Sequence, residues 1–300
     1  MISIIICSRT GNLDSELSVN IKATIGIEHE IILINNTDNK YGICQAYNIG
    51  VKQSKYDILC FMHDDISYHT QNWGSNALAH FTSSDAAAIG VAGSPYCAFM
   101  PGPWWGSGIL YENLLQHDKN SIEAALKANS GGMARKEAIL LDGAWFCIKK
   151  STFKQVSFDE TNFKGFHFYD VDTCMQIHRA GGKIYCINDV LIQHASLGEV
   201  NSTWIESALV FHQKWAAHLP ATCLNLTKTE AGRLEYKTLN SFILACAANK
   251  YTNKKIYAIA LKSLLKFKQG YLFYKTPGYF VKFLFKYLLK KGAPFYSLNY

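Results

Sequence analysis

The chain has 300 residues, of which 49% are hydrophobic and 18% charged, and its formal net charge at pH 7 is +7. This length and composition suit one large α/β domain with an appendage and a substantial buried core, and they exclude an intrinsically disordered chain. Nine cysteines occur without any Cys-x-x-Cys spacing, so neither a zinc site nor a disulfide framework is indicated, and buried free thiols in a reducing cytosol are expected.

Short apolar runs and segments of helical periodicity alternate through the first two hundred residues. This alternation predicts a largely parallel sheet with helices on both faces. The predicted strands are Ile2 to Cys7, Glu30 to Ile34, Asp57 to Met62 and Ala86 to Ala92, and the predicted helices between them are Ser15 to Ile25 and Ile43 to Ser54. The start of the chain lacks the basic region and cleavage site of a signal peptide, which favours a first strand and a cytoplasmic location.

The loop after the first strand, Ser8 to Asn12, contains one glycine. It has neither the G-x-G-x-x-G pattern of dinucleotide-binding proteins nor a P-loop pattern. Dinucleotide binding and Walker-type phosphate binding are therefore disfavoured.

Two adjacent carboxylates, Asp64 and Asp65, follow the apolar run that ends at Met62. Ligands of open α/β sheets bind where such strands end. Two neighbouring carboxylates repel each other unless a cation compensates them, and oxygen ligands favour Mg²⁺ or Mn²⁺, which also hold substrate phosphates. The alternative is a solvated Asp-Asp turn.

The segment from Gly93 to Gly108 contains three prolines, four glycines and the pair Trp104 and Trp105. It is predicted to be a long irregular loop, and such loops in compact domains tend to be functional. The tryptophan pair is either a stacking platform for a ring or a filler of the core.

Two more acidic residues precede an amphipathic helix that glycine ends near residue 181. Asp170 and Asp172 are expected at its start, where free backbone N–H groups and the helix dipole stabilise carboxylates. Capping explains one of them and not both. Further along, His194 ends a strand-like run and is either a metal or phosphate ligand or a structural histidine.

The C-terminal part of the chain is strongly basic. Residues 236–300 contain 12 lysines and no acidic residue, while the rest contains 18 basic and 23 acidic residues. Lys282, Lys286 and Lys290 recur at helical spacing opposite apolar side chains, and the apolar stretches are too short to span a bilayer. A helix lying on an anionic membrane surface is favoured over nucleic-acid binding, and a helix packed on the domain is the alternative.

The order and spacing of these motifs resemble the family 2 glycosyltransferases of GT-A fold over about residues 1 to 200, most closely the subgroup of bacterial capsule and surface-polysaccharide synthesis. The motifs that carry the resemblance are Ser8-Arg9-Thr10, Asn35-Asn36-Thr37-Asp38, the helix Gly42 to Ser54, Met62-His63-Asp64-Asp65, Leu141-Asp142-Gly143-Ala144 and Tyr169-Asp170-Val171-Asp172-Thr173-Cys174.

The resemblance implies roles for particular residues. Asp64 and Asp65 match a D-x-D-type motif whose last carboxylate binds the metal on the donor diphosphate, while its neighbour reaches the ribose. Asp170 matches the general base of an inverting transfer, and Asp172 is expected to cap the helix or bind the acceptor. The expected donor-binding residues are Ser8, Arg9, Thr10, Asn35, Asn48 and Asp64, the expected metal ligands are Asp64, Asp65 and His194, and the expected acceptor residues are Trp104, Trp105 and Asp142.

Three residues depart from the family pattern. Asn35 replaces the usual acidic residue after the second strand, Tyr169 occupies the first position of the E-D pair, and Tyr47 stands where many members have arginine. These departures concern the identity of the nucleotide and the basicity of the catalytic carboxylate more than the fold.

The expected protein is thus an α/β glycosyltransferase of GT-A fold with a catalytic domain over residues 1–220 and a basic helical extension over 221–300. It would use Mn²⁺ or Mg²⁺ and a nucleotide diphosphate sugar, with a UDP-sugar favoured, to extend a glycan or lipid-linked acceptor at an anionic membrane surface, without binding nucleic acid. Two rival functions are a sugar nucleotidyltransferase, which would normally have a glycine-rich first loop, and a non-catalytic binding module of the same fold.

Overall fold

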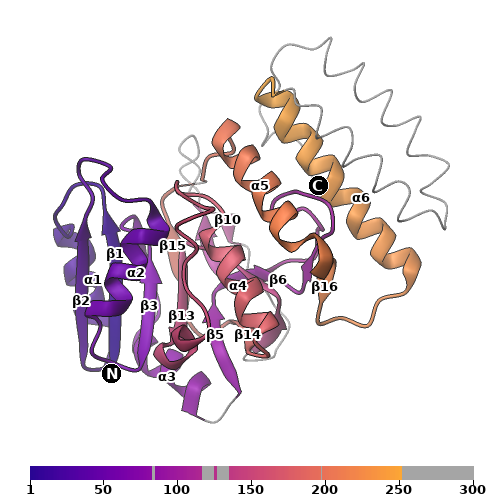
Figure 1. Cartoon of the computed structure of the whole chain (residues 1–300). Helices are drawn as coiled ribbons and strands as arrows, with labels where there is room; N and C mark the ends of the chain where they lie inside the picture. The colour runs from indigo at the N-terminus through magenta and orange to yellow at the C-terminus, as the bar shows by residue number, and fades with distance from the viewer. Residues whose placement is uncertain (83–84, 117–124, 127–134, 197, 252–300) are drawn as a thin grey trace. The chain divides into compact units, whose positions relative to one another are not determined.

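A computed structural model describes residues 1–82, 85–116, 125–126, 135–196 and 198–251, which form two compact units (Figure 1). Unit 1 comprises Met1–Pro95 and Leu110–Gly198. Unit 2 comprises Tyr96–Ile109 and the chain from Glu199 onward. The expected domain boundary at residue 220 stays a prediction, since the units group the chain by internal contact and are interleaved in sequence.

Unit 1 is built on a mostly parallel seven-stranded sheet with the order β11-β14-β5-β13-β3-β1-β2. Strands β13 and β11 run antiparallel to the other five. The strands are β1 Ile2–Ser8, β2 His29–Asn35, β3 Ile58–Met62, β5 Ala86–Gly90, β11 Arg135–Ala138, β13 Trp145–Lys149 and β14 Lys183–Ile187. The apolar side chains of β1 and β3 are almost completely buried, as expected of central strands covered on both faces.

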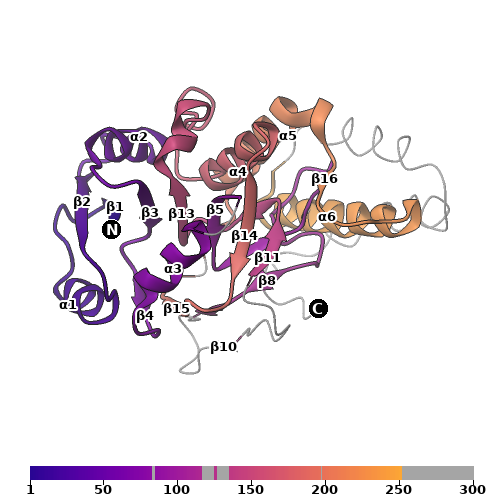
Figure 2. The same ribbon diagram turned by 90° about the horizontal axis from the view of Figure 1, so that it is seen from below.

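Helices cover both faces of this sheet (Figure 2). Helices α2 and α4 lie on one face, and α1 and α3 lie on the other. Their bounds are α1 Ser15–Thr24, α2 Ile43–Gln53, α3 Trp73–Thr82 and α4 Tyr169–Arg179. Helix α2 approaches β1 very closely, because a Cβ atom at Gly50 would lie 2.3 Å from Ile5 Cγ2. The predicted α/β architecture is therefore confirmed.

Two smaller sheets complete unit 1. One has the order β10-β9-β15-β4 and the other the order β12-β6-β8. Their strands are β4 Ile66–Tyr68, β6 Ala92–Ser94, β8 Tyr111–Glu112, β9 Leu114–Gln116, β10 Ala125–Leu126, β12 Leu140–Leu141 and β15 Ile192–His194, and a 3₁₀ turn, η1, spans Lys150–Lys154. The pairing of β15 with β4 sets His194 opposite Ile66, directly after the predicted acidic pair.

Unit 2 is mainly helical in its described part. Its elements are α5 Ser202–Trp215, η2 Ala216–His218, α6 Lys228–Ala248 and the short pair of β7 Tyr96–Cys97 with β16 Ala221–Thr222. Helix α6 begins with a capping box, in which Thr227 and Glu230 bond each other's backbone N–H groups. A small apolar cluster around Met100 and Leu239 joins the segment after β7 to α6.

Most predicted elements are confirmed, with ends shifted by one or two residues. Two expectations about residues 86–108 are wrong. The predicted strand Ala86 to Ala92 is divided into β5 and β6, and the segment Gly93 to Gly108 is not wholly irregular, because it contributes to β6 and β7 before its loop begins. These short strands could not be predicted locally, because the segment is rich in turn-forming residues and the partner strands come from distant parts of the chain.

The predicted amphipathic helix near Lys282 to Lys290 lies outside the described residues. Within the part of the chain that the structure describes, no helix combines the length and apolar character needed to cross a membrane.

Candidate functional site

The carboxyl ends of β1, β2 and β3 meet at one edge of the sheet of unit 1. Ser8 and Asn35 are partners in the β1–β2 register, and the chain after Met62 leaves the neighbouring strand. The Ser8 hydroxyl lies 3.1 Å from the Thr10 hydroxyl, and Asn35 Oδ1 accepts hydrogen bonds from the backbone and side chain of Thr37, each at 3.1 Å. The structure thus brings together the predicted nucleotide-binding residues Ser8, Thr10 and Asn35.

Two other predicted donor-binding residues already have protein partners. The Arg9 guanidinium, whose side chain is 75% exposed, lies 3.5 Å from Asp64 Oδ1. Asn48 Nδ2 donates to the Phe158 carbonyl at 2.8 Å, and the Phe158 N–H donates to Asn48 Oδ1 at 3.2 Å. Asn48 therefore anchors the loop that leads to α4, and its contact with a nucleotide stays a prediction.

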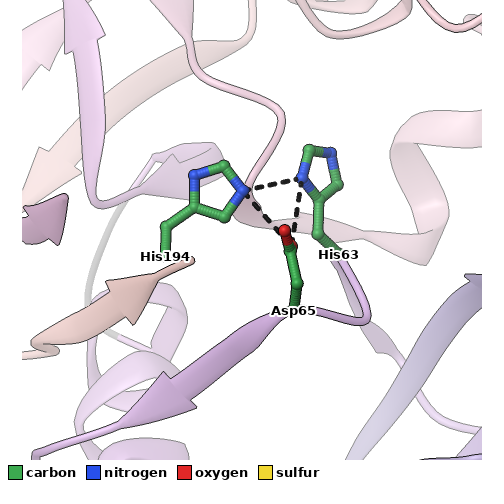
Figure 3. Close-up of side chains that lie close together, drawn as sticks. All are labelled: His63, Asp65 and His194. Atoms are coloured by element: carbon green, nitrogen blue, oxygen red, sulfur yellow. Dashed lines mark hydrogen bonds and ion pairs between the residues drawn. The ribbon is translucent and has the colours of Figure 1, made fainter. Parts of the chain in front are cut away.

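A compact cluster of His63, Asp65 and His194 lies at the same edge (Figure 3). His63 Nδ1 lies 3.2 Å from His194 Nε2, and Asp65 Oδ1 lies 3.3 Å from His194 Nε2 and 3.9 Å from His63 Nδ1. His63 and Asp65 come from the turn between β3 and β4, and His194 comes from the end of β15. The predicted ligands Asp65 and His194 are thus neighbours, while Asp64 turns toward Arg9 and does not join this cluster.

The charges within the cluster are set by burial and by mutual contact. Burial, together with the neighbouring His194, lowers the pKa of His63 to about 4, so its ring is neutral at neutral pH. Burial alone would raise the pKa of Asp65, but the hydrogen bond and charge of His194 outweigh it and hold the pKa below its usual value. A neutral imidazole beside an ionised carboxylate is the state in which such groups bind metal ions.

The donor atoms of the cluster fit a divalent cation. All three lie within 4.8 Å of one another, and an ion about 2.0–2.2 Å from each of them is compatible with their separations. Two imidazole nitrogens and one carboxylate oxygen form a mixed donor set, which suits Mn²⁺ better than Mg²⁺ because Mg²⁺ prefers oxygen ligands. Three protein ligands would leave positions open for oxygen atoms of a substrate.

The first turn of α4 brings Asp170 close to Asp142. Burial and the negative charge of Asp142 raise the pKa of Asp170 to about 7. A carboxyl group with this pKa can accept and release a proton near neutral pH. Asp142 is held in place because its Oδ1 accepts a hydrogen bond from the Ala144 N–H at 2.9 Å.

The second acid of α4 has a different environment. Asp172 is fully buried, and its Oδ2 accepts a hydrogen bond from Gln176 at 2.8 Å within the helix. Phe168, which has no side-chain cap, occupies the N-cap position, so Asp172 is not the capping residue. Of the two predicted catalytic residues, only Asp170 is partly exposed.

Aromatic residues occur in both units. Phe166 is 53% exposed, and its ring centroid lies 5.3 Å from that of His63. The predicted acceptor residues Trp104 and Trp105 form an edge-to-face pair, 5.5 Å between centroids, in unit 2, whereas Asp142 belongs to unit 1. A shared acceptor site of these three residues stays a prediction.

Three residues of the site were not predicted as site residues from the sequence. In the sequence, His63 appears only as part of the Met62-His63-Asp64-Asp65 motif. Its spacing of two residues from Asp65 is a signal that the two side chains could lie on the same side of the chain. The Tyr169 hydroxyl lies 2.9 Å from His63 Nε2, and Gln116 Nε2 lies 3.4 Å from His194 Nδ1. The sequence marks Tyr169 only as a departure from the family pattern and does not mark Gln116, because both contacts join residues far apart in the chain.

The fold is similar to that of several solved structures. GalNAc-T7, solved with UDP, GalNAc and Mn²⁺, matches with a TM-score of 0.50 and 12% identity over 87% of this chain. This chain spans 54% of that one, about half its length. Weaker similarities link it to the mannosyltransferase PcManGT from Pyrobaculum calidifontis, solved with GDP-Man and Mn²⁺, and to TarS residues 1–349 from S. aureus, solved with UDP-GlcNAc. PcManGT matches with a TM-score of 0.48 and 14% identity over 97% of this chain and 87% of that one. TarS matches with a TM-score of 0.47 and 11% identity over 89% of this chain and 80% of that one.

No curated protein sequence matches this chain. The sequence profile described as "Glycosyltransferase like family" matches residues 3–218, which is more than half of the chain. The profile match covers the mostly parallel sheet, the His63, Asp65 and His194 cluster and Asp170 alike. The chain therefore belongs to the glycosyltransferase-like family, and its fold is that of the GT-A glycosyltransferases.

Proposed function

We propose that this protein transfers a sugar from a nucleotide diphosphate sugar to the hydroxyl group of a glycan or lipid-linked acceptor, with inversion at the sugar carbon. The observation that carries the proposal is that Asp170, with its pKa raised to about 7, directly follows Tyr169, whose hydroxyl contacts a cluster of two histidines and a carboxylate fit for a cation. Membership of the glycosyltransferase-like family supports it.

The donor would lie along the edge where β1, β2 and β3 end. Ser8, Thr10 and Asn35 offer hydroxyl and amide groups for the base and ribose, and the exposed Arg9 offers a positive charge for the phosphates. Asp64, which holds Arg9, would orient that charge and reach the ribose. A protein of the same fold has been solved with UDP and Mn²⁺, which supports a UDP-sugar and Mn²⁺ here.

The cluster would hold the divalent cation through His63 Nδ1, Asp65 Oδ1 and His194 Nε2. When bound there, Mn²⁺ or Mg²⁺ would supply positive charge that offsets the negative charge on the departing diphosphate. The negative charge of Asp65 would offset part of the charge of the cation.

Asp170 would act as the general base. Its ionised carboxylate takes the proton of the acceptor hydroxyl as that oxygen bonds to the sugar carbon and the bond to the diphosphate breaks. A positioned base contributes about 10²–10⁴-fold to such a reaction. One base and one displacement give inversion, because the hydroxyl attacks the face opposite the leaving group.

The nucleotide-binding part of the proposal is tested by thermal denaturation with a panel of nucleotide sugars, with and without Mn²⁺. A true donor at about 100 times its Kd should stabilise the protein by about 2.7 kcal/mol, and only when Mn²⁺ is present. Donor hydrolysis or transfer in the same samples would distinguish an enzyme from a non-catalytic binding module. Stabilisation without any turnover would support the module, and release of pyrophosphate from a nucleoside triphosphate and a sugar phosphate would support a nucleotidyltransferase.

We further propose that the enzyme works in surface-polysaccharide synthesis at the cytoplasmic face of a membrane. The support is the basic, aromatic-rich sequence of residues 252–300, since each lysine near an anionic surface contributes about 1 kcal/mol. The full chain should co-sediment with anionic vesicles, and the bound fraction should fall as salt rises. A chain ending at Tyr251 should not co-sediment. This truncation leaves α6 whole, because that helix ends at Ala248. Equal binding by both chains would refute membrane attachment through the tail.

A further inference from the structure

We infer that Tyr169 is a positioning residue that fixes the His63 ring with its proton on Nε2, so that Nδ1 faces the cluster as a metal-binding atom. The inference deepens the proposed function and rests on the proposed cation site. It concerns a residue that departs from the family pattern and that neither donor nor acceptor would have to contact.

Tyr169 occupies the first position of α4 and is 3% exposed. Its hydroxyl oxygen lies 2.9 Å from His63 Nε2 and 3.0 Å from the carbonyl oxygen of Gly143. Both separations are within hydrogen-bond distance. The hydroxyl therefore bridges a ring nitrogen of the cluster and a backbone carbonyl.

The direction of the two hydrogen bonds follows from the available protons. The phenol has one proton, and the Gly143 carbonyl can only accept, so the Tyr169 hydroxyl donates to Gly143. The same oxygen must then accept from His63, which requires the proton of the neutral ring to be on Nε2. His63 Nδ1 consequently carries a lone pair.

That lone pair is directed at the other members of the cluster. Nδ1 is the His63 nitrogen nearer to His194 Nε2 and Asp65 Oδ1, while Nε2 points away from them (Figure 3). Metal-binding histidines generally donate their second ring N–H to an oxygen atom that fixes the tautomer and the ring orientation. Tyr169 supplies that oxygen and relays the contact to the backbone.

The missing side chain of Gly143 leaves the space that the Tyr169 hydroxyl occupies. A Cβ atom at Gly143 would lie 2.1 Å from Tyr169 Oη, so a larger residue there would displace the phenol. The ring itself packs edge-to-face against Tyr47, with centroids 5.5 Å apart. Phenylalanine would fill the same space, so the packing explains an aromatic ring at position 169 and the bridge explains its hydroxyl.

The inference is tested with Tyr169→Phe, which keeps the ring and removes the hydroxyl. Mn²⁺ is titrated into the donor-free protein and followed by electron paramagnetic resonance or calorimetry. The expected result is affinity about 10–100-fold lower than that of the wild type. Tyr96→Phe is the matched control, because it removes another buried tyrosine hydroxyl, which donates to Glu235 Oε1 at 2.6 Å within unit 2 and has no contact with the cluster residues. Its Mn²⁺ affinity should be unchanged.

A second measurement separates this inference from the proposed function. Nitrogen-15 NMR of the metal-free protein reports which His63 nitrogen carries the proton. We expect Nε2–H in the wild type and in Tyr96→Phe, and a mixture of tautomers in Tyr169→Phe. A wild-type protein that binds no Mn²⁺ would refute the cation site. The His63 tautomer, measured without metal, would still show whether Tyr169 fixes the ring. Unchanged His63 tautomers in a folded Tyr169→Phe protein, with or without a change in Mn²⁺ affinity, would overturn the inference.

Discussion

Unit 1 and unit 2 each contain a helix with a carboxylate that is shielded from solvent, partly at Asp170 and almost completely at Glu235, and the two carboxylates have opposite surroundings. Glu235 in α6 is 2% exposed, and its oxygens accept hydrogen bonds from the Tyr96 hydroxyl at 2.6 Å and from the N–H groups of Phe99 and Met100 at 2.8 and 2.9 Å. Asp170 in α4 instead faces a second carboxylate, Asp142, whose charge joins burial in raising the pKa of Asp170 to about 7.

The comparison teaches that burial alone does not identify a reactive acid. Glu235 has a hydroxyl and two amide donors, so it stabilises the segment after β7 against α6 and is structural. The local fold keeps Asp142 beside Asp170 although their repulsion costs stability, and this cost is typical of functional sites. Four substitutions test this distinction, in order of expected effect.

The largest effect is expected from Asp170→Asn. The amide keeps the shape of the side chain and accepts no proton, so sugar transfer under saturating donor should fall by about 10² or more while donor affinity is retained. Steady-state transfer and donor calorimetry measure the two quantities. Asp172→Asn is the control, and it should lose less activity because Asp172 is buried inside the helix. Transfer at the wild-type rate by Asp170→Asn would place the base elsewhere.

Asp65→Ala should abolish the dependence of donor binding on Mn²⁺ while leaving the fold intact, because Asp65 gives charge to the cluster and little to the core. We expect a loss of affinity on the order of 10²-fold, consistent with removal of one charged ligand. Asp64→Ala is the matched neighbour, and its smaller effect should come through Arg9. Calorimetry with UDP and Mn²⁺ measures both variants, and equal losses would show that the cluster does not distinguish them.

Glu235→Gln should destabilise the protein and leave Mn²⁺ affinity unchanged. The amide replaces an acceptor oxygen by a donor that opposes a backbone N–H or the Tyr96 hydroxyl, which costs about 1–3 kcal/mol. Chemical denaturation measures the loss, and Glu206→Gln on the exposed side of α5 is a control expected to change stability by less than about 0.5 kcal/mol. A Glu235→Gln protein of wild-type stability would show that Glu235 does not have the structural role assigned to it.

Asp142→Asn should shift the pH dependence of transfer. Asp170 must be ionised to act as a base, so kcat/KM is expected to rise with pH through the pKa of about 7 in the wild type. Removing the charge of Asp142 favours the ionised form of Asp170 and lowers its pKa, so the rise should move to lower pH. The amide oxygen that this substitution introduces can still accept from the Ala144 N–H. A pH profile that does not move would show that burial alone sets the pKa.

The sequence by itself determined strands β1, β2 and β3 of the central sheet, the helix that begins near Asp170 and the acidic pair that follows β3. These features are local, because a buried strand or an amphipathic helix is written in the spacing of its own apolar residues. The family resemblance added the roles of Asp65 and Asp170 on the same local motifs.

Only the tertiary structure decided which of these residues act together. His63 and His194 are 131 positions apart, and the register of β15 against β4 makes them neighbours. The turn after β3 directs Asp65 into the cluster and Asp64 toward Arg9, and the closeness of Asp170 to Asp142 sets its pKa. Long-range strand register and the direction of single side chains depend on the packing of the whole unit, so no spacing within one segment encodes them.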